Sequence, residues 1–179
     1  MTHPSNILNL PKCIWLTGLS GAGKTTIAQA VQERLQAQGH LVYVLDGDLL
    51  RHGLNRDLGF SNQDRSENNR RVAEVSRLMV AAGVTVLVAL ISPFEEDRRK
   101  ARALFDEGQF VEVFVDAPLL VCMRRDVKGL YAKAQQGHVH AMTGLGSPYE
   151  SPTKSDLRLE TGVDTLENCV ERVLELLKS

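Results

Sequence analysis

The chain has 179 residues, of which 43% are hydrophobic and 24% charged, a balance typical of one globular domain with a sizeable core. Its 21 basic and 22 acidic side chains leave a net charge of −1, so we expect no nucleic-acid partner, and any anion-binding site must be local. No apolar run approaches the roughly 20 residues of a membrane span, so we expect no membrane contact and a single domain over residues 1–179.

Residues 1–12 read as an N-terminal extension. They lack the basic start and continuous apolar stretch of a signal peptide, so we expect a cytoplasmic protein. The three cysteines, Cys13, Cys122 and Cys169, are too far apart in sequence for a metal-binding pair, and their odd number argues against a disulfide framework. All three lie in apolar stretches, and we expect them in the core.

Short apolar runs alternate with helical patterns along the chain. Four runs read as strands: CIWLT (13–17), LVYVL (41–45), VTVLVAL (84–90) and FVEVFV (110–115). The shorter and more polar LRLET (157–161) is a candidate fifth strand. This alternation predicts an α/β fold with a mostly parallel central sheet covered by helices on both faces.

Helix signals lie between these runs. Residues 25–38 read as the first crossover helix, and Ser61 with Asp64 forms a capping box that starts a second helix ending at Gly83. Asp164 is expected to cap the last helix. By contrast, residues 128–152 are rich in Gly, His and Pro without a convincing apolar period, and so long a stretch predicts a mobile lid or substrate loop.

The segment GLSGAGKT, residues 18–25, matches G-x-x-x-x-G-K-[ST] at every position and follows a predicted strand. In this phosphate-binding loop, backbone N–H groups turn inward on phosphate oxygens, and the helix N-terminus adds partial positive charge. Lys24 would then reach the β- and γ-phosphates of ATP, and the Thr25 hydroxyl would ligate Mg²⁺. The residues expected to bind the nucleotide are Gly18, Ser20, Gly21, Ala22, Gly23, Lys24, Thr25 and Thr26.

This loop does not specify the reaction, because switches, motors and small-molecule kinases share it. A GTPase would carry [NT]-K-x-D after a buried strand, and TKSD occurs at residues 153–156. The preceding residues GLGSPYESP cannot form such a strand, so we interpret TKSD as a chance match.

Two acidic residues end the second predicted strand, in LVYVLDGD. Asp46 and Asp48 would lie at the carboxyl edge of the sheet, where α/β proteins bind ligands. One carboxylate, Asp46, would attend to Mg²⁺ directly or through water, and the other, Asp48, would orient an attacking hydroxyl group. The alternative is a D-G turn with solvated acids.

Basic, amide and aromatic side chains follow within a short span: Arg51, Asn55, Arg56, Phe60, Arg65, Asn68, Arg70 and Arg71. Arg65 and Asn68 are three residues apart and share a helix face, while guanidinium groups match phosphate or sulfate oxygens in pairs. The Phe60 ring offers a surface on which a base can stack. This collection predicts an anionic nucleotide as acceptor, whereas Arg56 and Arg70 are interpreted as solvated.

Five stretches resemble the adenylyl-sulfate kinase family: WLTGLSGAGKTT, LDGDLLRHGLNRDLGFSNQDRSENNRR, ALISPF, RRDVKGLYAKA and TGLGSPYESP. They span residues 15–152, and the second is the most specific. The resemblance implies a P-loop kinase fold, a homodimer, and MgATP-dependent phosphorylation of adenosine 5′-phosphosulfate on its ribose 3′-hydroxyl, a step of sulfate assimilation.

The resemblance also implies residue roles. Asp48 would meet the 3′-hydroxyl, with Lys24 and Asp46 completing the catalytic set, and Arg125 would contact ATP. The implied substrate-binding residues are Asp48, Arg51, Phe60, Arg65, Asn68, Ile91, Ser92, Lys128 and Leu145. The chain departs from the family at Met142, which stands where a lid phenylalanine is usual.

Ser92 has two interpretations. Some relatives are thought to form a phosphoserine here, but Ser92, Pro93 and Glu95 fit a helix cap, first position and third position, so we favour a structural role. Two alternatives to the whole assignment remain: another small-molecule kinase of similar architecture, or an ATP-binding regulatory protein without turnover.

Overall fold

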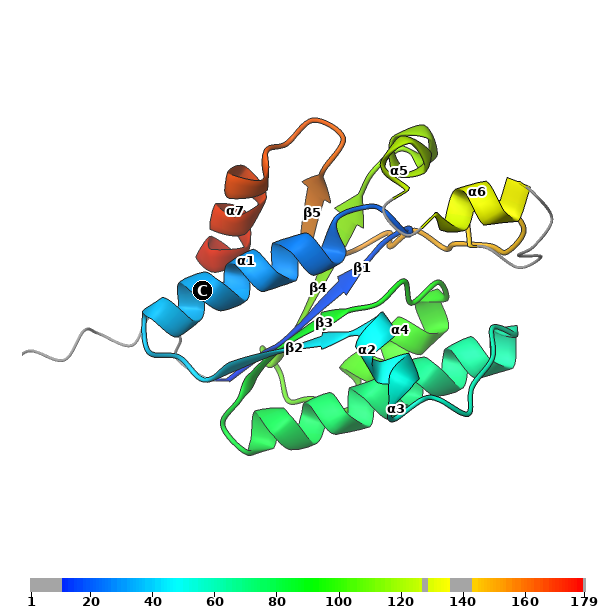
Figure 1. The fold of residues 1–179 in the computed structure, drawn as a ribbon. Coiled ribbons are helices and arrows are strands. Elements are labelled where there is room, and N and C mark those ends of the chain that lie inside the picture. The colour runs from blue at the N-terminus through cyan, green and yellow to red at the C-terminus, as the bar shows by residue number, and fades with distance from the viewer. Residues whose placement is uncertain (1–10, 127–128, 136–142, 179) are drawn as a thin grey trace, which may run out of the picture.

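A computed structural model describes residues 11–126, 129–135 and 143–178. Its central sheet has five strands in the order β2-β3-β1-β4-β5, and every described pairing is parallel. The strands are β1 (Cys13–Thr17), β2 (Val42–Asp46), β3 (Thr85–Ala89), β4 (Phe110–Asp116) and β5 (Leu157–Glu160). The predicted mostly parallel α/β sheet is confirmed, including its candidate fifth strand (Figure 1).

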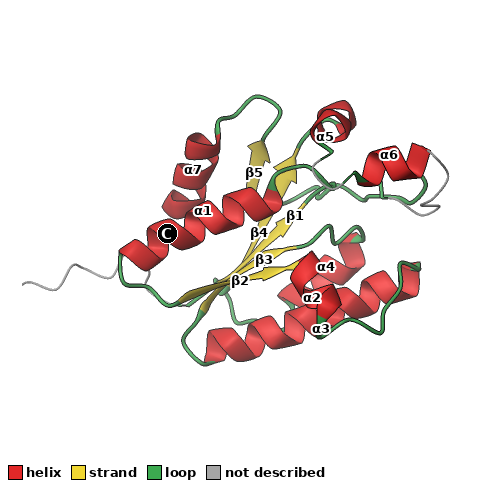
Figure 2. Ribbon diagram, in the orientation of Figure 1, coloured by secondary structure: helices red, strands yellow, loops and turns green. Residues whose placement is uncertain are grey.

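Helices cover both faces of this sheet. They are α1 (Lys24–Ala37), α2 (Gly47–His52), α3 (Asn62–Ala81), α4 (Glu95–Arg102), α5 (Leu119–Arg125), α6 (Leu130–Gln135) and α7 (Leu166–Lys178). Helices α1 and α7 pack on one face and α3 and α4 on the other, while α2, α5 and α6 lie toward the carboxyl ends of the strands (Figure 2). Within the described residues, no helix is both long and apolar enough to cross a membrane.

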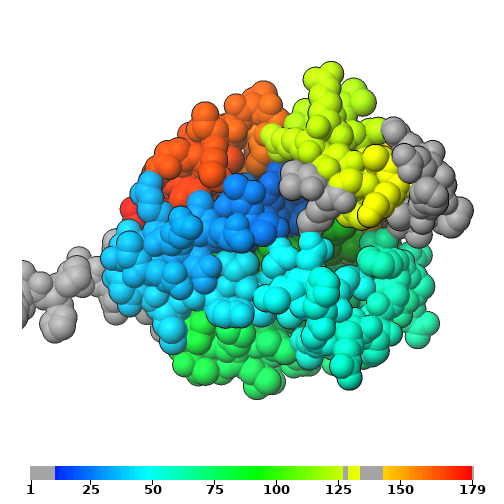
Figure 3. Space-filling model, viewed as in Figure 1, coloured from blue at the N-terminus to red at the C-terminus, as the bar shows by residue number. Residues whose placement is uncertain are grey.

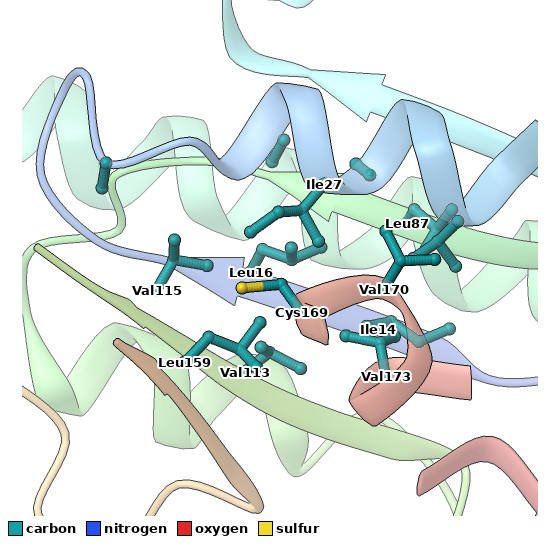
Figure 4. Close-up of a cluster of buried hydrophobic side chains, with 14 of the residues drawn as sticks. Ile14, Leu16, Ile27, Leu87, Val113, Val115, Leu159, Cys169, Val170 and Val173 are labelled. Carbon is teal, nitrogen blue, oxygen red and sulfur yellow. The ribbon is translucent and has the colours of Figure 1, made fainter. Parts of the chain in front are cut away.

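The core consists of two layers separated by the sheet. On β1, Ile14 and Leu16 point into the cluster under α1 and α7, whereas Cys13 and Trp15 point into the cluster under α3 and α4. Figure 4 shows the first cluster, to which Leu16 of β1 and Cys169 of α7 both belong. All three cysteines are buried, as predicted. Because β1 is buried on both sides, it reads as a continuous apolar run.

Strand register brings the carboxyl ends of the three adjacent strands together. Asp46 of β2 pairs with Ala89 of β3, and Ala89 pairs in turn with Leu16 of β1. The segments that follow these three strands therefore leave the sheet at one edge. This is where the phosphate-binding loop, the start of α2 and the loop after β3 meet.

The structure corrects some local predictions. The capping box of Ser61 and Asp64 is present, but α7 begins at Leu166, and the Asn168 backbone N–H is bound by Thr165 Oγ1, 3.2 Å away. Thr165 therefore caps α7, and the prediction that Asp164 is the cap is wrong. Asp164 Oδ2 instead accepts from Arg172 Nη1 at 3.2 Å. The irregular segment 128–152 also contains the short helix α6, whose six residues are too few to show a helical period.

Candidate functional site

In the phosphate-binding loop, residues 18–25, two glycines combine a positive φ with a close approach to other backbone. Gly18 has φ 152° and Gly21 has φ 78°. A Cβ atom would lie 2.3 Å from the Val115 carbonyl oxygen at Gly18, and 2.9 Å from the Cys122 carbonyl oxygen at Gly21. These glycines therefore let the loop pass close to β4 and α5, where a side chain would collide with backbone.

Lys24 lies inside the curve of this loop. Its ammonium group donates to the carbonyl oxygens of Gly18, at 2.9 Å, and Leu19, at 2.8 Å, and its side chain is buried. These bonds hold a positive charge beside the helix N-terminus of α1. A phosphate chain that enters the loop meets both charges together.

Thr25, Asp46 and Asp48 form a connected group. Thr25 Oγ1 donates to Asp46 Oδ2 at 2.7 Å, and the Asp48 backbone N–H donates to Asp46 Oδ1 at 2.9 Å. Asp46 thus caps α2 and ties the start of α1 to the start of α2. A hydroxyl and a carboxylate at this separation are hard oxygen donors of the kind that Mg²⁺ takes beside phosphate groups.

The acceptor side is built around Phe60, whose side chain is mostly exposed. The Arg51 guanidinium lies 4.3 Å from the centre of the Phe60 ring and donates to the Gly59 carbonyl oxygen at 2.9 Å. Arg65 donates through Nε to the Phe60 carbonyl oxygen at 3.0 Å and through Nη1 to Thr143 Oγ1 at 2.9 Å. Both cations lie near one aromatic ring, since the Arg65 guanidinium is 5.9 Å from the centre of the Phe60 ring.

Burial lowers the pKa of the Arg51 and Arg65 guanidinium groups, and at Arg65 the neighbouring Arg51 charge lowers it further. Both groups stay protonated, because an arginine pKa begins far above neutrality. Two partly desolvated positive charges next to each other repel, and an anion between them relieves that repulsion. The electrostatics of this side favour a negatively charged ligand.

Ser92 is the one described non-glycine residue with a left-handed backbone, φ 38°. Its hydroxyl accepts from Trp15 Nε1 at 2.9 Å, and its carbonyl accepts from Arg98 Nη1 at 2.7 Å. The predicted capping box is wrong: α4 begins at Glu95, and its cap is Phe94, which makes no side-chain cap bond. The Ser92 hydroxyl instead serves as the hydrogen-bond acceptor that the buried Trp15 indole N–H requires.

Three further residues support the nucleotide loop. Tyr131 donates its hydroxyl to the Ser20 carbonyl oxygen at 2.9 Å, and Thr161 donates its hydroxyl to the Ala22 carbonyl oxygen at 2.7 Å. Arg125 reaches the Gly21 carbonyl oxygen at 3.3 Å and also donates to Thr161. Sequence reasoning included Arg125 but missed Tyr131 and Thr161, which lie more than a hundred residues from the loop and carry no local signal.

One cavity of about 560 Å³ holds most of the predicted site. Figure 3 shows the surface hollowed between the blue segment with the phosphate-binding loop and the cyan segment with α2. The predicted residues that line it are Ser20, Gly21, Ala22, Gly23, Lys24, Thr25, Thr26, Asp46, Asp48, Arg51, Phe60, Arg65, Asn68, Ile91, Ser92 and Arg125. The phosphate-binding loop and the acceptor cluster, which were predicted separately, thus face one cavity. The acceptor cluster consists of Asp48, Arg51, Phe60, Arg65 and Asn68.

Two of the predicted residues that the structure describes do not line that cavity. Gly18 shapes the loop without lining the space, and Leu145 lines a separate open groove with Leu19 and Leu119. Lys128 lies outside the described residues, as does Met142. The TKSD segment also takes no part: Asp156 accepts from Arg102 at 2.5 Å and from the Glu112 backbone N–H at 2.6 Å.

Comparison with known proteins identifies the family. The family model for adenylylsulphate kinase matches residues 10–160. An adenylyl-sulfate kinase of Clostridium acetobutylicum is 51% identical over 165 residues, which cover 92% of this chain and 82% of the relative. The bifunctional enzyme NodQ of Azospirillum brasilense is 55% identical over 167 residues, 93% of this chain and 27% of the relative. The chain therefore spans about a quarter of the length of the bifunctional relatives it matches.

The fold has a close counterpart among solved structures. The structure of the Mycobacterium tuberculosis APS kinase CysC in complex with AMPPNP and APS matches with a TM-score of 0.91 and 48% identity, covering 95% of this chain and 99% of that one. Sequence and fold agree over nearly the whole length. The chain belongs to the adenylyl-sulfate kinase family.

Proposed function

We propose that this protein is a kinase that transfers the γ-phosphoryl group of ATP to the ribose 3′-hydroxyl of adenosine 5′-phosphosulfate. The observation that carries the proposal is the shared cavity, in which a phosphate-binding loop faces an aspartate, two arginines and an aromatic ring. The related Mycobacterium tuberculosis structure, which contains AMPPNP and APS, supports the same pair of ligands here.

On the donor side, the inward N–H groups of residues 18–25 bind the β- and γ-phosphates. Lys24, whose ammonium group now donates to the Gly18 and Leu19 carbonyl oxygens, would exchange these partners for phosphate oxygens. The Thr25 hydroxyl and Asp46 would hold Mg²⁺, which when bound neutralises charge on the β- and γ-phosphates. Arg125, with Thr161 behind it, borders the same space.

On the acceptor side, the adenine stacks on the face of Phe60 away from Arg51, so that the ring lies between a cation and a base. Arg51 and Arg65 pair with the phosphate and sulfate oxygens. Backbone atoms of Ile91 and Ser92 border the sugar. This arrangement favours an anionic nucleotide over a neutral nucleoside, because only the anion supplies phosphate and sulfate oxygens for the two guanidinium groups.

Asp48 orients the 3′-hydroxyl toward the γ-phosphorus. A bond forms between the 3′-oxygen and that phosphorus, and the bond to the β,γ-bridging oxygen breaks, so ADP leaves with the electron pair. The hydroxyl proton passes to the Asp48 carboxylate late in the step. Because the transition state of phosphoryl transfer is loose, orientation and charge neutralisation matter more than the basicity of Asp48.

The proposal has further parts that rest on family membership and sequence. We expect a homodimer, a cytoplasmic location, and a lid in the region 128–152 that includes Lys128 and Leu145. Light scattering of the purified protein measures the first. A mass equal to one chain at micromolar concentration would contradict the dimer.

A coupled assay for ADP release tests the function. Adenosine 5′-phosphosulfate, AMP, adenosine and gluconate are offered in turn with MgATP, and we expect turnover with the sulfonucleotide to exceed the others. Preference for adenosine or gluconate would identify another small-molecule kinase. ATP binding without ADP release for any acceptor would identify a regulatory protein.

A further inference from the structure

Asn55 is a buried polar residue next to the acceptor side of the cavity. It lies in the turn between α2 and α3, and its side chain is fully buried. Its backbone is used within that turn, since its N–H donates to the Leu50 carbonyl oxygen at 2.9 Å and its carbonyl accepts from Leu58 at 3.1 Å. The turn is therefore held without the Asn55 side chain.

Among the residues that the structure describes, the Asn55 side chain has one hydrogen-bond partner. Asn55 Nδ2 donates to Asn68 Oδ1 at 3.0 Å, and this bond is buried. Asn55 Oδ1 has no hydrogen-bond partner among the described residues, although it is shielded from solvent. Burying a carbonyl oxygen without a donor is unfavourable, so a packing role alone would be better served by an apolar side chain.

The bond matters because of what Asn68 faces. Asn68 lines the cavity and Asn55 does not. A carboxamide carries its oxygen on one side and its amino group on the other. Holding Asn68 Oδ1 toward Asn55 leaves Nδ2, a donor, as the atom offered to the cavity. The reverse orientation would present a carbonyl oxygen, which an anionic ligand repels.

We propose that Asn55 is a positioning residue that fixes the Asn68 carboxamide with its amino group toward the acceptor nucleotide. It acts through Asn68 and touches no substrate. The inference rests on the proposed function, because it requires a ligand rich in acceptor oxygens on this side of the cavity. Variants of Asn55 and Asn68 make it possible to test this inference separately from the proposed function.

The test is a double-mutant cycle on the full chain, with steady-state kinetics for adenosine 5′-phosphosulfate and for ATP. Loss of one orienting hydrogen bond predicts that Asn55→Ala raises the KM for the sulfonucleotide about three- to tenfold, with kcat changed less than about twofold. The KM for ATP should be unchanged. In the Asn68→Ala background, removing Asn55 should have no further effect.

Controls separate positioning from loosening of the fold. Ser76→Ala removes a buried hydroxyl from the same helix two turns from Asn68, and its KM should equal that of the unmodified protein. Thermal unfolding checks each variant, and Asn55→Ser, whose hydroxyl is too short to reach Asn68, replaces Asn55→Ala if the alanine variant does not fold.

Each failure has its own signature. An unmodified protein inactive with adenosine 5′-phosphosulfate overturns the proposed function and this inference together. An active protein whose Asn55→Ala variant keeps a normal KM overturns the inference alone. A KM increase of equal size in the Asn68→Ala background also overturns it, because Asn55 would then act through some other group.

Discussion

Asp48 lies two residues beyond Asp46, which binds its backbone N–H, so the carboxylate is carried on the first turn of α2 at the cavity wall. We expect Asp48→Asn to lower kcat at least about 100-fold with ATP affinity nearly unchanged, because the amide keeps the shape but cannot take the proton. Kinetics and an ATP titration measure both. Asp106→Asn, at an exposed site outside the cavity, is the control. Near-normal turnover of Asp48→Asn would remove this residue from its role.

Arg65 and Arg70 are on the same helix but in different surroundings. Arg65 is buried beside Phe60, whereas Arg70 is exposed and paired with Glu67 at 2.7 Å. Arg65→Ala should weaken sulfonucleotide binding by about 2–3 kcal/mol through loss of charge-assisted bonds, and Arg70→Ala should have little effect. Dissociation constants of each variant for adenosine 5′-phosphosulfate and for ATP test this prediction. If Arg65→Ala weakened ATP binding alone, the acceptor side would be wrongly assigned.

The position of a single residue could be predicted where one local sequence pattern determined which way its side chain points. Arg65 and Asn68 could be placed together because both follow the cap at Ser61 by a known number of residues. The hydrogen bond from Arg65 to Thr143 could not be predicted, because the partners are separated by 78 residues of chain. The same holds for the pairing of Asn55 with Asn68 across a turn.

At the scale of elements, Arg98 connects several parts of the molecule. Its side chain is 1% exposed and donates to Glu112 Oε1 of β4 at 2.8 Å, to the Ser92 carbonyl oxygen at 2.7 Å and to the Glu150 carbonyl oxygen at 2.7 Å. One side chain of α4 thus holds the loop after β3 against β4. Pairing with Glu112 compensates its buried charge.

Glu112→Met should lower the free energy of unfolding by about 3–5 kcal/mol, because it leaves the Arg98 charge buried without its partner. Urea denaturation measures the change. Glu96→Met removes the partner of Arg99 from an exposed pair and should leave the free energy of unfolding nearly unchanged. Equal effects of the two substitutions would show that burial of the Arg98 pair is unimportant for stability.

The strands and the long helices were predicted well, and the short helices α5 and α6 were not. The run CIWLT forms β1 with its predicted bounds, and α1 begins one residue earlier than expected. Helices α5 and α6, of seven and six residues, are too short for an apolar period to emerge. At Ser92 the sequence pattern predicted a helix cap, but the hydroxyl accepts a hydrogen bond from Trp15 instead. Sequence spacing does not reveal this tertiary contact.

At the scale of the whole molecule, ligand binding should be visible as stability. A non-hydrolysable ATP analogue with Mg²⁺, at a hundred times its Kd, should stabilise the fold by about 2.7 kcal/mol, or roughly 5–10 °C in Tm for a domain of this size. Chelating Mg²⁺ should reduce the shift, because Thr25 and Asp46 then lack the ion that joins them to the phosphates. Thermal unfolding measures both.

Lys24→Ala is the matched control for that shift, since it removes the ammonium group from the loop and leaves the acceptor cluster intact. Its Tm should rise much less on addition of the analogue. An undiminished shift would mean that the analogue binds elsewhere than residues 18–25.

Trp15 is the single tryptophan of the chain, fully buried on β1, and its indole N–H is bonded to Ser92 at the cavity wall. All tryptophan fluorescence therefore comes from one indole in a dry environment, one hydrogen bond away from the loop that borders the acceptor. The molecule carries a built-in optical reporter, whose emission follows any shift of that loop in real time without an added dye.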